Sequence, residues 1–338
     1  MNAELPHDPN IAVLPVEAAV CAVIVLIGLA ALYAWERRHR RSAPSTNHLL
    51  LLGALLPSCA GYTLKPSVVV TDDSGRSIEV NVEITPLARR PSGWVQDKAG
   101  VRDPSFATTP VYRATAIKPQ SDLSAKMPPI YDQGMIGSCT GNGLAAILDY
   151  ARGRQGTRFI TPSRLFIYFA EREIEGRVNQ DAGAMIRTGV DVLADLGACK
   201  ERTWPYKEAK WQTRPHAASY TEALNYQALH GYKVDNSDGR SIRVALSAGY
   251  PVVFGALLYS GMDRVTYQRP TLEMPRKRES TIGGHCMVIV GHNDKTKLYK
   301  VRNSWGKTWA DNGHFFMPYD YVHAAKLCGD FWVIDQAE

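Results

Sequence analysis

The chain has 338 residues, of which 45 % are apolar and 21 % are charged, and its formal net charge is +6. This length is enough for one globular unit of two lobes plus an extension, and so mild a charge does not indicate a nucleic-acid partner. Six cysteines are scattered without a Cys-x-x-Cys pair, which argues against a disulfide-stapled fold and leaves only a Cys199–Cys328 bridge open.

The N-terminal residues predict a membrane anchor. Residues 1–17 are polar, and residues 18–35 form an uncharged apolar run that is nearly long enough to span a bilayer as a helix. Residues 36–41 then supply four arginines, which mark the cytoplasmic side of a transmembrane helix. The N-terminus would therefore lie outside the cytoplasm. A buried core helix is the alternative interpretation of residues 18–35.

A second, shorter apolar stretch lies at residues 49–56 and is followed by Pro-Ser-Cys-Ala-Gly, which contains Cys59. Within residues 36–60, a basic region, a short apolar stretch and small residues before a cysteine have the layout of an export signal. The layout is similar to that of a bacterial lipoprotein signal, in which Cys59 would carry the lipid. This interpretation places the globular part in the periplasm, and a segment on the cytoplasmic face of the membrane is the alternative.

Residues 61–120 predict a β-hairpin followed by an extended connector. Residues 68–71 and 77–84 are strand-like, and Asp-Asp-Ser-Gly at residues 72–75 forms the turn between them. Residues 86–119 are rich in Pro, Gly, Arg and Ser and show no period. We interpret this connector as a spacer rather than as a cover for a cleft, because nothing in its residues argues for a cover.

Residues 121–338 contain the features that predict chemistry, and the first of them is Cys139. Apolar residues from Leu144 to Ala151 recur at the spacing of one helical face, and Ser138 is a good N-cap for that helix. At a helix N-terminus, unpaired backbone N–H groups and the macrodipole favour the reactive thiolate. An inert buried cysteine is the alternative when Cys139 is considered alone.

The remainder of this region predicts helices and then mainly strands. Helical spacing is found at residues 163–174, 184–196 and 239–247. Strands are expected at residues 251–257, 286–290, 297–301, 314–317 and 331–334. This succession predicts an α+β architecture, in which a helical lobe and an antiparallel β lobe enclose a cleft.

A histidine and an asparagine downstream complete a pattern with Cys139. Two glycines precede His285 at the start of a buried strand, and Asn303 follows 18 positions later. Cys, His and Asn in this order fit a nucleophile, a base and an orienting amide that folding brings together. Cys286 beside His285 suggests a metal pair, but adjacent strand residues point to opposite faces, so a small core residue is preferred. We therefore predict no metal and no cofactor.

At these positions the chain resembles the papain-like cysteine peptidases, over roughly residues 120–338. The resemblance assigns Cys139 as the nucleophile, His285 as the general base and Asn303 as the amide that fixes the imidazole. It implies a two-lobed fold with a helical lobe, a β-barrel-like antiparallel lobe and the active site in the cleft between them.

Further matches extend the resemblance beyond the three central residues. Gln133, six residues before the cysteine, matches the oxyanion-hole side chain, and Trp305 matches the indole that covers the Asn–His contact. Gly183 resembles the glycine whose backbone pairs with substrate. Thr140 replaces an aromatic residue that is often found after the nucleophile, which places the chain nearer to bacterial-type members.

The sequence thus predicts a membrane-tethered cysteine endopeptidase that acts on peptides or proteins through an acyl-enzyme. A thiolate–imidazolium pair of Cys139 and His285 is expected, because an imidazolium lowers the pKa of a neighbouring thiol. One alternative is an acyltransferase or amidase that acts on cell-wall peptides. Another is an inactive papain-like binding protein, although such a scaffold would be expected to lose at least one of the four central residues, and all four are present.

Overall fold

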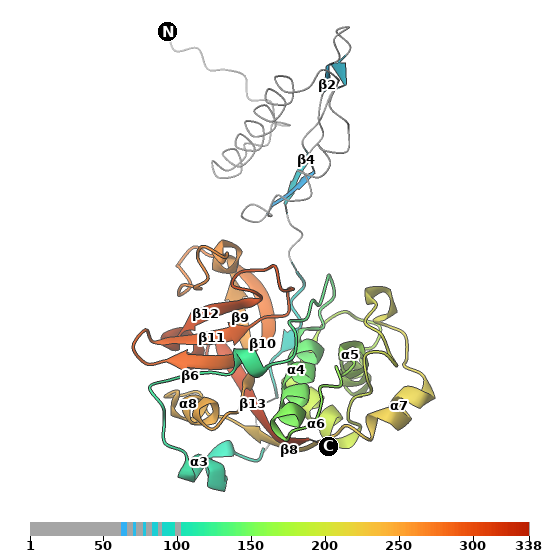
Figure 1. Cartoon of the computed structure of the whole chain (residues 1–338). Coiled ribbons are helices and arrows are strands. Elements are labelled where there is room, and N and C mark those ends of the chain that lie inside the picture. Colours follow the sequence, from blue (N-terminus) through green and yellow to red (C-terminus); the bar gives the residue numbers. More distant parts are fainter. Residues whose placement is uncertain are drawn as a thin grey trace, which may run out of the picture. The chain divides into compact units, whose positions relative to one another are not determined.

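The computed structural model describes residues 90–98 and 103–337 with their side chains, and the backbone of four short strands between residues 62 and 86 (Figure 1). The chain divides into two compact units, residues 1–89 and residues 90–338. The run at residues 18–35 and Cys59 lie outside the described residues. Within the described part, no helix has the length and apolar character needed to cross a membrane.

The four strands of the first unit form two antiparallel pairs. β1 (Tyr62–Lys65) pairs with β4 (Glu83–Pro86), and β2 (Val70–Thr71) pairs with β3 (Ser77–Ile78). The inner pair falls within the two stretches for which hairpin strands are expected. β1 lies where no strand is expected from the sequence.

The second unit contains a seven-stranded antiparallel sheet. Its spatial order is β12-β11-β10-β9-β13-β8, and β6 pairs with one end of β10. The strands are β6 (Gln120–Asp122), β8 (Ala228–Lys233), β9 (Val252–Tyr259), β10 (Thr281–Asn293), β11 (Leu298–Arg302), β12 (His314–Pro318) and β13 (Cys328–Ala337). A separate two-stranded parallel sheet joins β5 (Trp94–Val95) to β7 (Ala184–Met185).

Helices lie mainly on one side of this sheet (Figure 1). The helical lobe consists of α4 (Cys139–Arg154), α5 (Arg164–Ile174), α6 (Ile186–Asp195) and α7 (Ala217–Ala223). Three short helices accompany the sheet, namely α3 (Pro110–Ala114), α8 (Arg240–Ser247) and α9 (Tyr319–His323). Single 3₁₀ turns are η1 (Phe106–Thr108), η2 (Ser124–Lys126), η3 (Glu208–Lys210) and η4 (Ser260–Arg264). This is the expected two-lobed α+β papain-like fold.

Helix α4 joins the two lobes because small residues let both neighbours approach it. A Cβ at Gly141 would lie 2.5 Å from the carbonyl oxygen of Arg164 at the start of α5. On another face of α4, a Cβ at Gly143 would lie 3.1 Å from Sγ of Cys286 in β10. Since α4 is buried for nearly its whole length, its first residue is held at the boundary between the lobes.

The structure decides two local points, which concern a possible disulfide and the N-cap of α4. Cys199 and Cys328 are both buried free thiols, so the bridge that was left open does not form. Ser138 occupies the N-cap position of α4, but its side chain makes no capping hydrogen bond. Its hydroxyl is instead 2.5 Å from the Tyr206 hydroxyl, so the loop before α4 is tied to the helical lobe.

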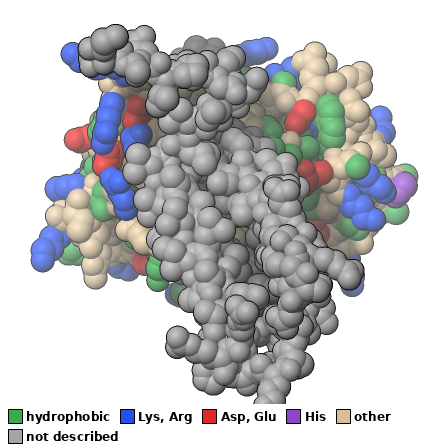
Figure 2. Space-filling view, turned by 90° about the horizontal axis from the view of Figure 1, so that it is seen from above, with side chains coloured by type: hydrophobic (Ala, Val, Ile, Leu, Met, Phe, Trp, Pro, Cys, Tyr) green, Lys and Arg blue, Asp and Glu red, His purple; other side chains and the backbone are tan. Residues whose placement is uncertain are grey.

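The visible surface of the second unit carries charges of both signs. In Figure 2, Lys and Arg side chains lie on both flanks with Asp and Glu side chains among them. Such mixing agrees with the mild net charge of the chain.

Candidate active site

Cys139 is the first residue of α4, and it is completely buried. Its Sγ accepts a hydrogen bond of 3.3 Å from the backbone N–H of Cys286 in β10. Because Cys286 directly follows His285, this contact places the thiol beside the histidine across the boundary between the helical lobe and the sheet. The Cys286 side chain points the other way, toward Gly143, and packs in the core as expected.

His285, Asn303 and Trp305 form one group on the strand side. Nε2 of His285 is 2.8 Å from Oδ1 of Asn303, and both side chains are buried. The Asn303 Oδ1 also accepts the backbone N–H of Ser304 at 2.8 Å, which fixes the orientation of the amide. The Trp305 ring lies 5.1 Å from the imidazole, centroid to centroid. Within the described residues, Nδ1 of His285 has no hydrogen-bond partner. This ring nitrogen therefore remains available for another interaction.

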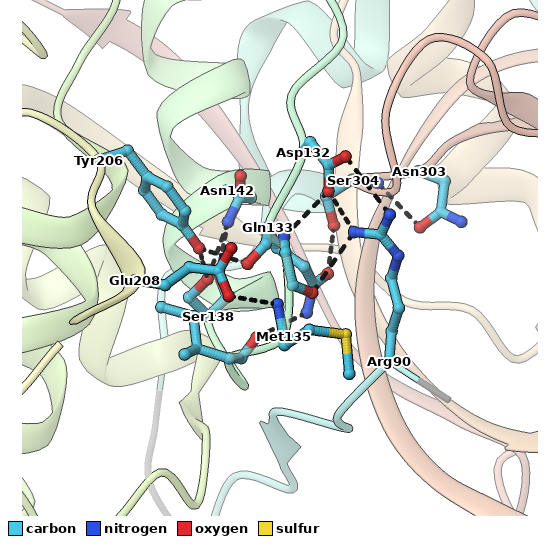
Figure 3. Close-up of polar contacts among 12 residues, drawn as sticks. Arg90, Asp132, Gln133, Met135, Ser138, Asn142, Tyr206, Glu208, Asn303 and Ser304 are labelled. Atoms are coloured by element: carbon cyan, nitrogen blue, oxygen red, sulfur yellow. Dashed lines mark hydrogen bonds and ion pairs between the residues drawn. The ribbon is translucent and has the colours of Figure 1, made fainter. Parts of the chain in front are cut away.

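Gln133 lies fully buried in the loop before α4. Its Oε1 accepts a 2.7 Å hydrogen bond from the Ser304 hydroxyl, and its Nε2 donates to the carbonyl of Ile136 at 3.0 Å. Figure 3 shows the Gln133 side chain between Ser304 and the loop that leads to Ser138. The Tyr206 hydroxyl donates to the Gln133 carbonyl at 2.7 Å. Gln133 is therefore fixed from both lobes.

The loop before Cys139 is fixed by a carboxylate that the sequence analysis did not single out. Asp181 accepts the backbone N–H of Gly137 on both oxygens, at 2.9 and 3.0 Å. The Tyr168 hydroxyl donates to the same carboxylate at 2.5 Å. Since Asp181 is two residues before Gly183, one short loop holds the residues before Cys139 and also carries the glycine that the resemblance assigns to substrate binding.

Residues 90–97 lie across Cys139, and we call them the covering segment. The N–H of Gly93 donates to the Gly284 carbonyl at 3.0 Å, and the Gly93 carbonyl accepts from Ala184 at 2.8 Å. A Cβ at Gly93 would lie 3.0 Å from Sγ of Cys139, so the glycine backbone rests on the thiol. The interpretation of this part of the connector as a spacer is therefore wrong.

Gly183 is part of the same arrangement. Its φ is +70°, and a Cβ there would lie 2.0 Å from the Gly93 carbonyl oxygen. The expected role of Gly183 in pairing with a substrate backbone stays a prediction, because the covering segment occupies that place in the structure.

Charged and polar side chains hold the two ends of the covering segment. At its start, Arg90 forms an ion pair with Asp132, which precedes Gln133 (Figure 3). At its end, Asp97 lies 3.5 Å from Nζ of Lys233 and 3.8 Å from Nε of Arg187. Between them, the Ser92 hydroxyl donates to the Ile282 carbonyl at 3.0 Å.

Burial disfavours charge on both Cys139 and His285 in the covered site. Burial raises the pKa of the Cys139 thiol to about 12. Burial lowers the pKa of the His285 imidazole to about 4, and the Arg90 cation of the covering segment acts in the same direction. Both shifts favour a neutral thiol and a neutral imidazole over the expected thiolate–imidazolium pair while the segment covers the site, because both groups are desolvated.

The fold and this site define the class of protein. Residues 119–329 match the family described as papain family cysteine protease, so the chain belongs to the papain family and is a cysteine-type peptidase. It is 39 % identical over 214 residues to an uncharacterised peptidase C1-like protein of Acanthamoeba polyphaga mimivirus, which covers 61 % of this chain and 69 % of that protein. It is 26 % identical over 242 residues to cysteine proteinase 3 of Entamoeba histolytica, with 66 % of this chain and 69 % of that protein covered.

Solved structures show the same fold. Xylellain, a cysteine protease from Xylella fastidiosa, matches with a TM-score of 0.67 and 36 % identity over 75 % of this chain and 100 % of that chain. Procathepsin B S9 from Trypanosoma congolense shares the fold with a TM-score of 0.56 at 14 % identity, over 74 % of this chain and 87 % of that chain.

Proposed function

We propose that the protein is a cysteine endopeptidase in which Cys139, His285 and Asn303 carry out the hydrolysis of a peptide bond. The observation that carries this proposal is the meeting of three separate elements: the start of α4, the start of the buried part of β10, and the loop after β11. The 2.8 Å contact between His285 and Asn303 and the hydrogen bond from Cys286 to the Cys139 sulfur bring these elements together.

Each residue has a distinct chemical task in this proposal. The Cys139 thiolate attacks the substrate carbonyl carbon, and the proton that His285 carries passes to the leaving amine as the C–N bond breaks. Asn303 holds the imidazole in the required orientation. The Cys139 backbone N–H and the Gln133 side-chain amide donate to the developing oxyanion. Water then hydrolyses the resulting thioester, which releases the acid and restores the thiol.

The covering segment makes the described state a latent one. A scissile carbonyl must point at the oxyanion donors, whereas the Gly93 carbonyl is bound to the N–H of Ala184 in β7. The segment therefore occupies the cleft without presenting its own peptide bond for attack. Its removal uncovers Cys139, relieves the desolvation of His285 and withdraws the Arg90 cation, all of which favour the reactive ion pair.

The proposal also includes attachment to a membrane. Its support is the apolar run at residues 18–35 with the arginines that follow it, and the signal-like residues before Cys59. The peptidase part would then be periplasmic, with the cytoplasmic face of the membrane as the alternative. Recovery of the chain in the membrane fraction, its release when residues 18–35 are deleted, and a lipid mass lost in Cys59→Ala would support this placement.

Turnover assays test the catalytic proposal. The full chain, a Gly93→Ala version and a Cys139→Ala version are each given a denatured protein and a cell-wall peptide, and the products are mapped by mass spectrometry. Cleavage of internal peptide bonds in the denatured protein, with loss of all turnover in Cys139→Ala, is expected. Reaction of the wall peptide alone would favour the amidase or acyltransferase alternative. An uncovered chain whose Cys139 reacts no faster than its other thiols would favour the inactive binding protein.

A further inference from the structure

The last residue of the covering segment, Asp97, has its carboxylate bound in a site formed by α6 and β8, which lie side by side (Figure 1). The Asp97 side chain is only 2 % exposed. Its Oδ1 accepts the backbone N–H of Arg187 in the first turn of α6 at 3.2 Å. Its Oδ2 lies 3.5 Å from Nζ of Lys233 at the end of β8. The structure therefore shows this site with a carboxylate bound.

Two cations of the site share one aromatic ring. Nζ of Lys233 lies 5.6 Å from the centre of the Trp332 ring, and the guanidinium carbon of Arg187 lies 5.7 Å from it. Cation–π attraction draws both side chains to this ring, which belongs to β13. The positive charges of the site are thus held by the sheet and by α6, not by the covering segment.

Two donors of the site are left for an acidic side chain to satisfy. α6 begins at Ile186, and Met185 at its N-cap position makes no side-chain capping hydrogen bond, so the N–H of Arg187 depends on Asp97. Nε of Arg187 is buried and has no hydrogen-bond partner among the described residues, since Oδ2 of Asp97 stays 3.8 Å away. A carboxylate that came closer than that of Asp97 would satisfy this donor as well.

The site remains when the covering segment leaves, because its other members are held by the rest of the second unit. Asp103 lies 3.5 Å from Nζ of Lys233, and the next residue, Pro104, accepts the Lys233 N–H at 2.8 Å. Asp330 on β13 lies 3.9 Å from the same Nζ. Of the three carboxylates beside Lys233, only Asp97 departs with the segment. Its departure uncovers the donors that it had bound.

We propose that the uncovered peptidase binds an acidic side chain of its substrate at this site, and so prefers peptides with an aspartate or glutamate about four residues from the cleaved bond. The spacing is that between Gly93, which rests on the Cys139 thiol, and Asp97, or about 13 Å of extended chain. A carboxylate receives charge-assisted hydrogen bonds here, an amide receives weaker ones, and a lysine meets two like charges. This inference rests on the proposed peptidase function.

The test uses the full chain and a peptide that it cleaves at a single bond, chosen from the products of the denatured protein. One Asp is moved through five positions on each side of that bond, and every Asp peptide competes in one tube with the Asn peptide of the same position. Mass spectrometry gives the ratio of the two kcat/KM values, from which the opening of the covering segment cancels. The ratio is expected to reach about ten at the third to fifth position on one side. At that position Glu should replace Asp, and Lys should react more slowly than Asn.

Lys233→Met is the decisive variant, since methionine keeps apolar contact with Trp332 and removes the charge. It should lower the Asp-to-Asn ratio to one or below, because Asp103 and Asp330 then repel the substrate carboxylate. Asp97→Asn should accelerate the cleavage of both peptides, since the covering segment is held less firmly, and should leave their ratio as it is.

Lys200→Met is the matched control. Lys200 also pairs with a carboxylate, that of Glu222 at 3.4 Å, and lies 4.8 Å from the centre of the Tyr226 ring, but it does not contact the site. Its loss should leave the Asp-to-Asn ratio unchanged at every position.

Arg187→Gln tests the site if the Lys233 variant does not fold, and it should lower the same ratio severalfold. A ratio without a maximum in the wild type, or a maximum that persists in Lys233→Met or in Arg187→Gln, would overturn the carboxylate site. Failure of the proposed function has a different signature, because then no peptide would be cleaved above the level of Cys139→Ala in any variant, Asp97→Asn included.

Discussion

The backbone of Gly93 lies against the sulfur of Cys139, and there is no room for a side chain at position 93. A Cβ at Gly93 would lie 3.0 Å from the sulfur and 1.8 Å from the carbonyl oxygen of Gly137. The second distance involves backbone that Asp181 holds in place, so the strain has to be relieved by the covering segment itself.

Gly93→Ala is therefore expected to loosen the covering segment. Overpacking of this kind costs about 1–3 kcal/mol, which is roughly a fivefold to 150-fold change in the ratio of covered to open chains. Alkylation of Cys139 by iodoacetamide should accelerate accordingly. Gly329→Ala is the control, because its Cβ would meet Trp94 at 3.7 Å and fits without displacement. Equal alkylation rates in the two variants would mean that Gly93 does not determine access to the thiol.

Asn303→Ala should slow catalysis through the histidine. Loss of the 2.8 Å contact with Nε2 leaves the imidazole free to turn, and a hydrogen bond from a charged donor is worth about 1.5–3 kcal/mol. We expect kcat/KM for a peptide to fall roughly tenfold to hundredfold in the uncovered chain. Asn236→Ala removes a comparable side-chain bond, to the Val322 carbonyl away from the site, and should leave kcat/KM unchanged. A similar loss in both variants would indicate a general effect on folding.

Gln133→Ala should separate hydrolysis from simple alkylation. The loss of one oxyanion donor typically costs about 3 kcal/mol, so kcat/KM should fall about a hundredfold. Iodoacetamide develops no oxyanion, and its reaction with Cys139 should keep its rate. Ser304→Ala removes the 2.7 Å bond that orients the Gln133 amide and should show the same pattern to a smaller degree. If alkylation falls as much as hydrolysis in Gln133→Ala, the side chain supports the loop rather than the oxyanion.

Acid should destabilise the covered chain through His285. Its pKa is lowered by burial to about 4, below the ordinary value of 6.5, so the unfolded chain binds more protons between these pH values. Stability that is present above pH 6.5 is then lost as the pH falls toward 4, by up to about 3 kcal/mol. The free energy of unfolding, measured against pH for the wild type and His285→Gln, gives this contribution as a difference. A difference that stays constant from pH 7 to pH 4 would contradict the buried neutral state.

The candidate catalytic residues could be selected from the sequence because each of them carries a strong local signal. Cys139 follows a turn and opens an amphipathic helix, His285 follows two glycines, and Asn303 stands before Ser-Trp. The structure places His285 2.8 Å from Asn303 and bonds the Cys139 sulfur to the N–H of the residue after His285, and the catalytic roles of the three residues stay a prediction. The family match and the two-lobed fold confirm the class of protein that these residues indicated.

The covering segment could not be predicted for a physical reason. The segment binds the site mainly through backbone hydrogen bonds of Gly93 and through the packing of the Trp94 indole. Neither interaction produces a periodic pattern or a charge pattern in the sequence. Only Ser-Gly-Trp within an aperiodic stretch hints at a close backbone approach. The charge on Cys139 and His285 depends on the same segment, because the segment desolvates both groups and so disfavours a thiolate–imidazolium pair. Ser138 differs for a local reason, since Tyr206 competes for its hydroxyl.

Asp97 lies near Lys233 and Arg187 and anchors the covering segment on the chain that it covers. The fraction of covered molecules should therefore respond to dilution differently from an inhibitor on a separate chain. An inhibitor on a separate chain dissociates as it is diluted, whereas a segment tethered to its own site keeps a fixed effective concentration. The covering segment therefore blocks Cys139 equally in a dilute and in a concentrated sample. A single cut between Asp97 and Asp103 would change this dependence. The covering segment would then bind as a separate molecule, and dilution would favour its dissociation and so activate the site.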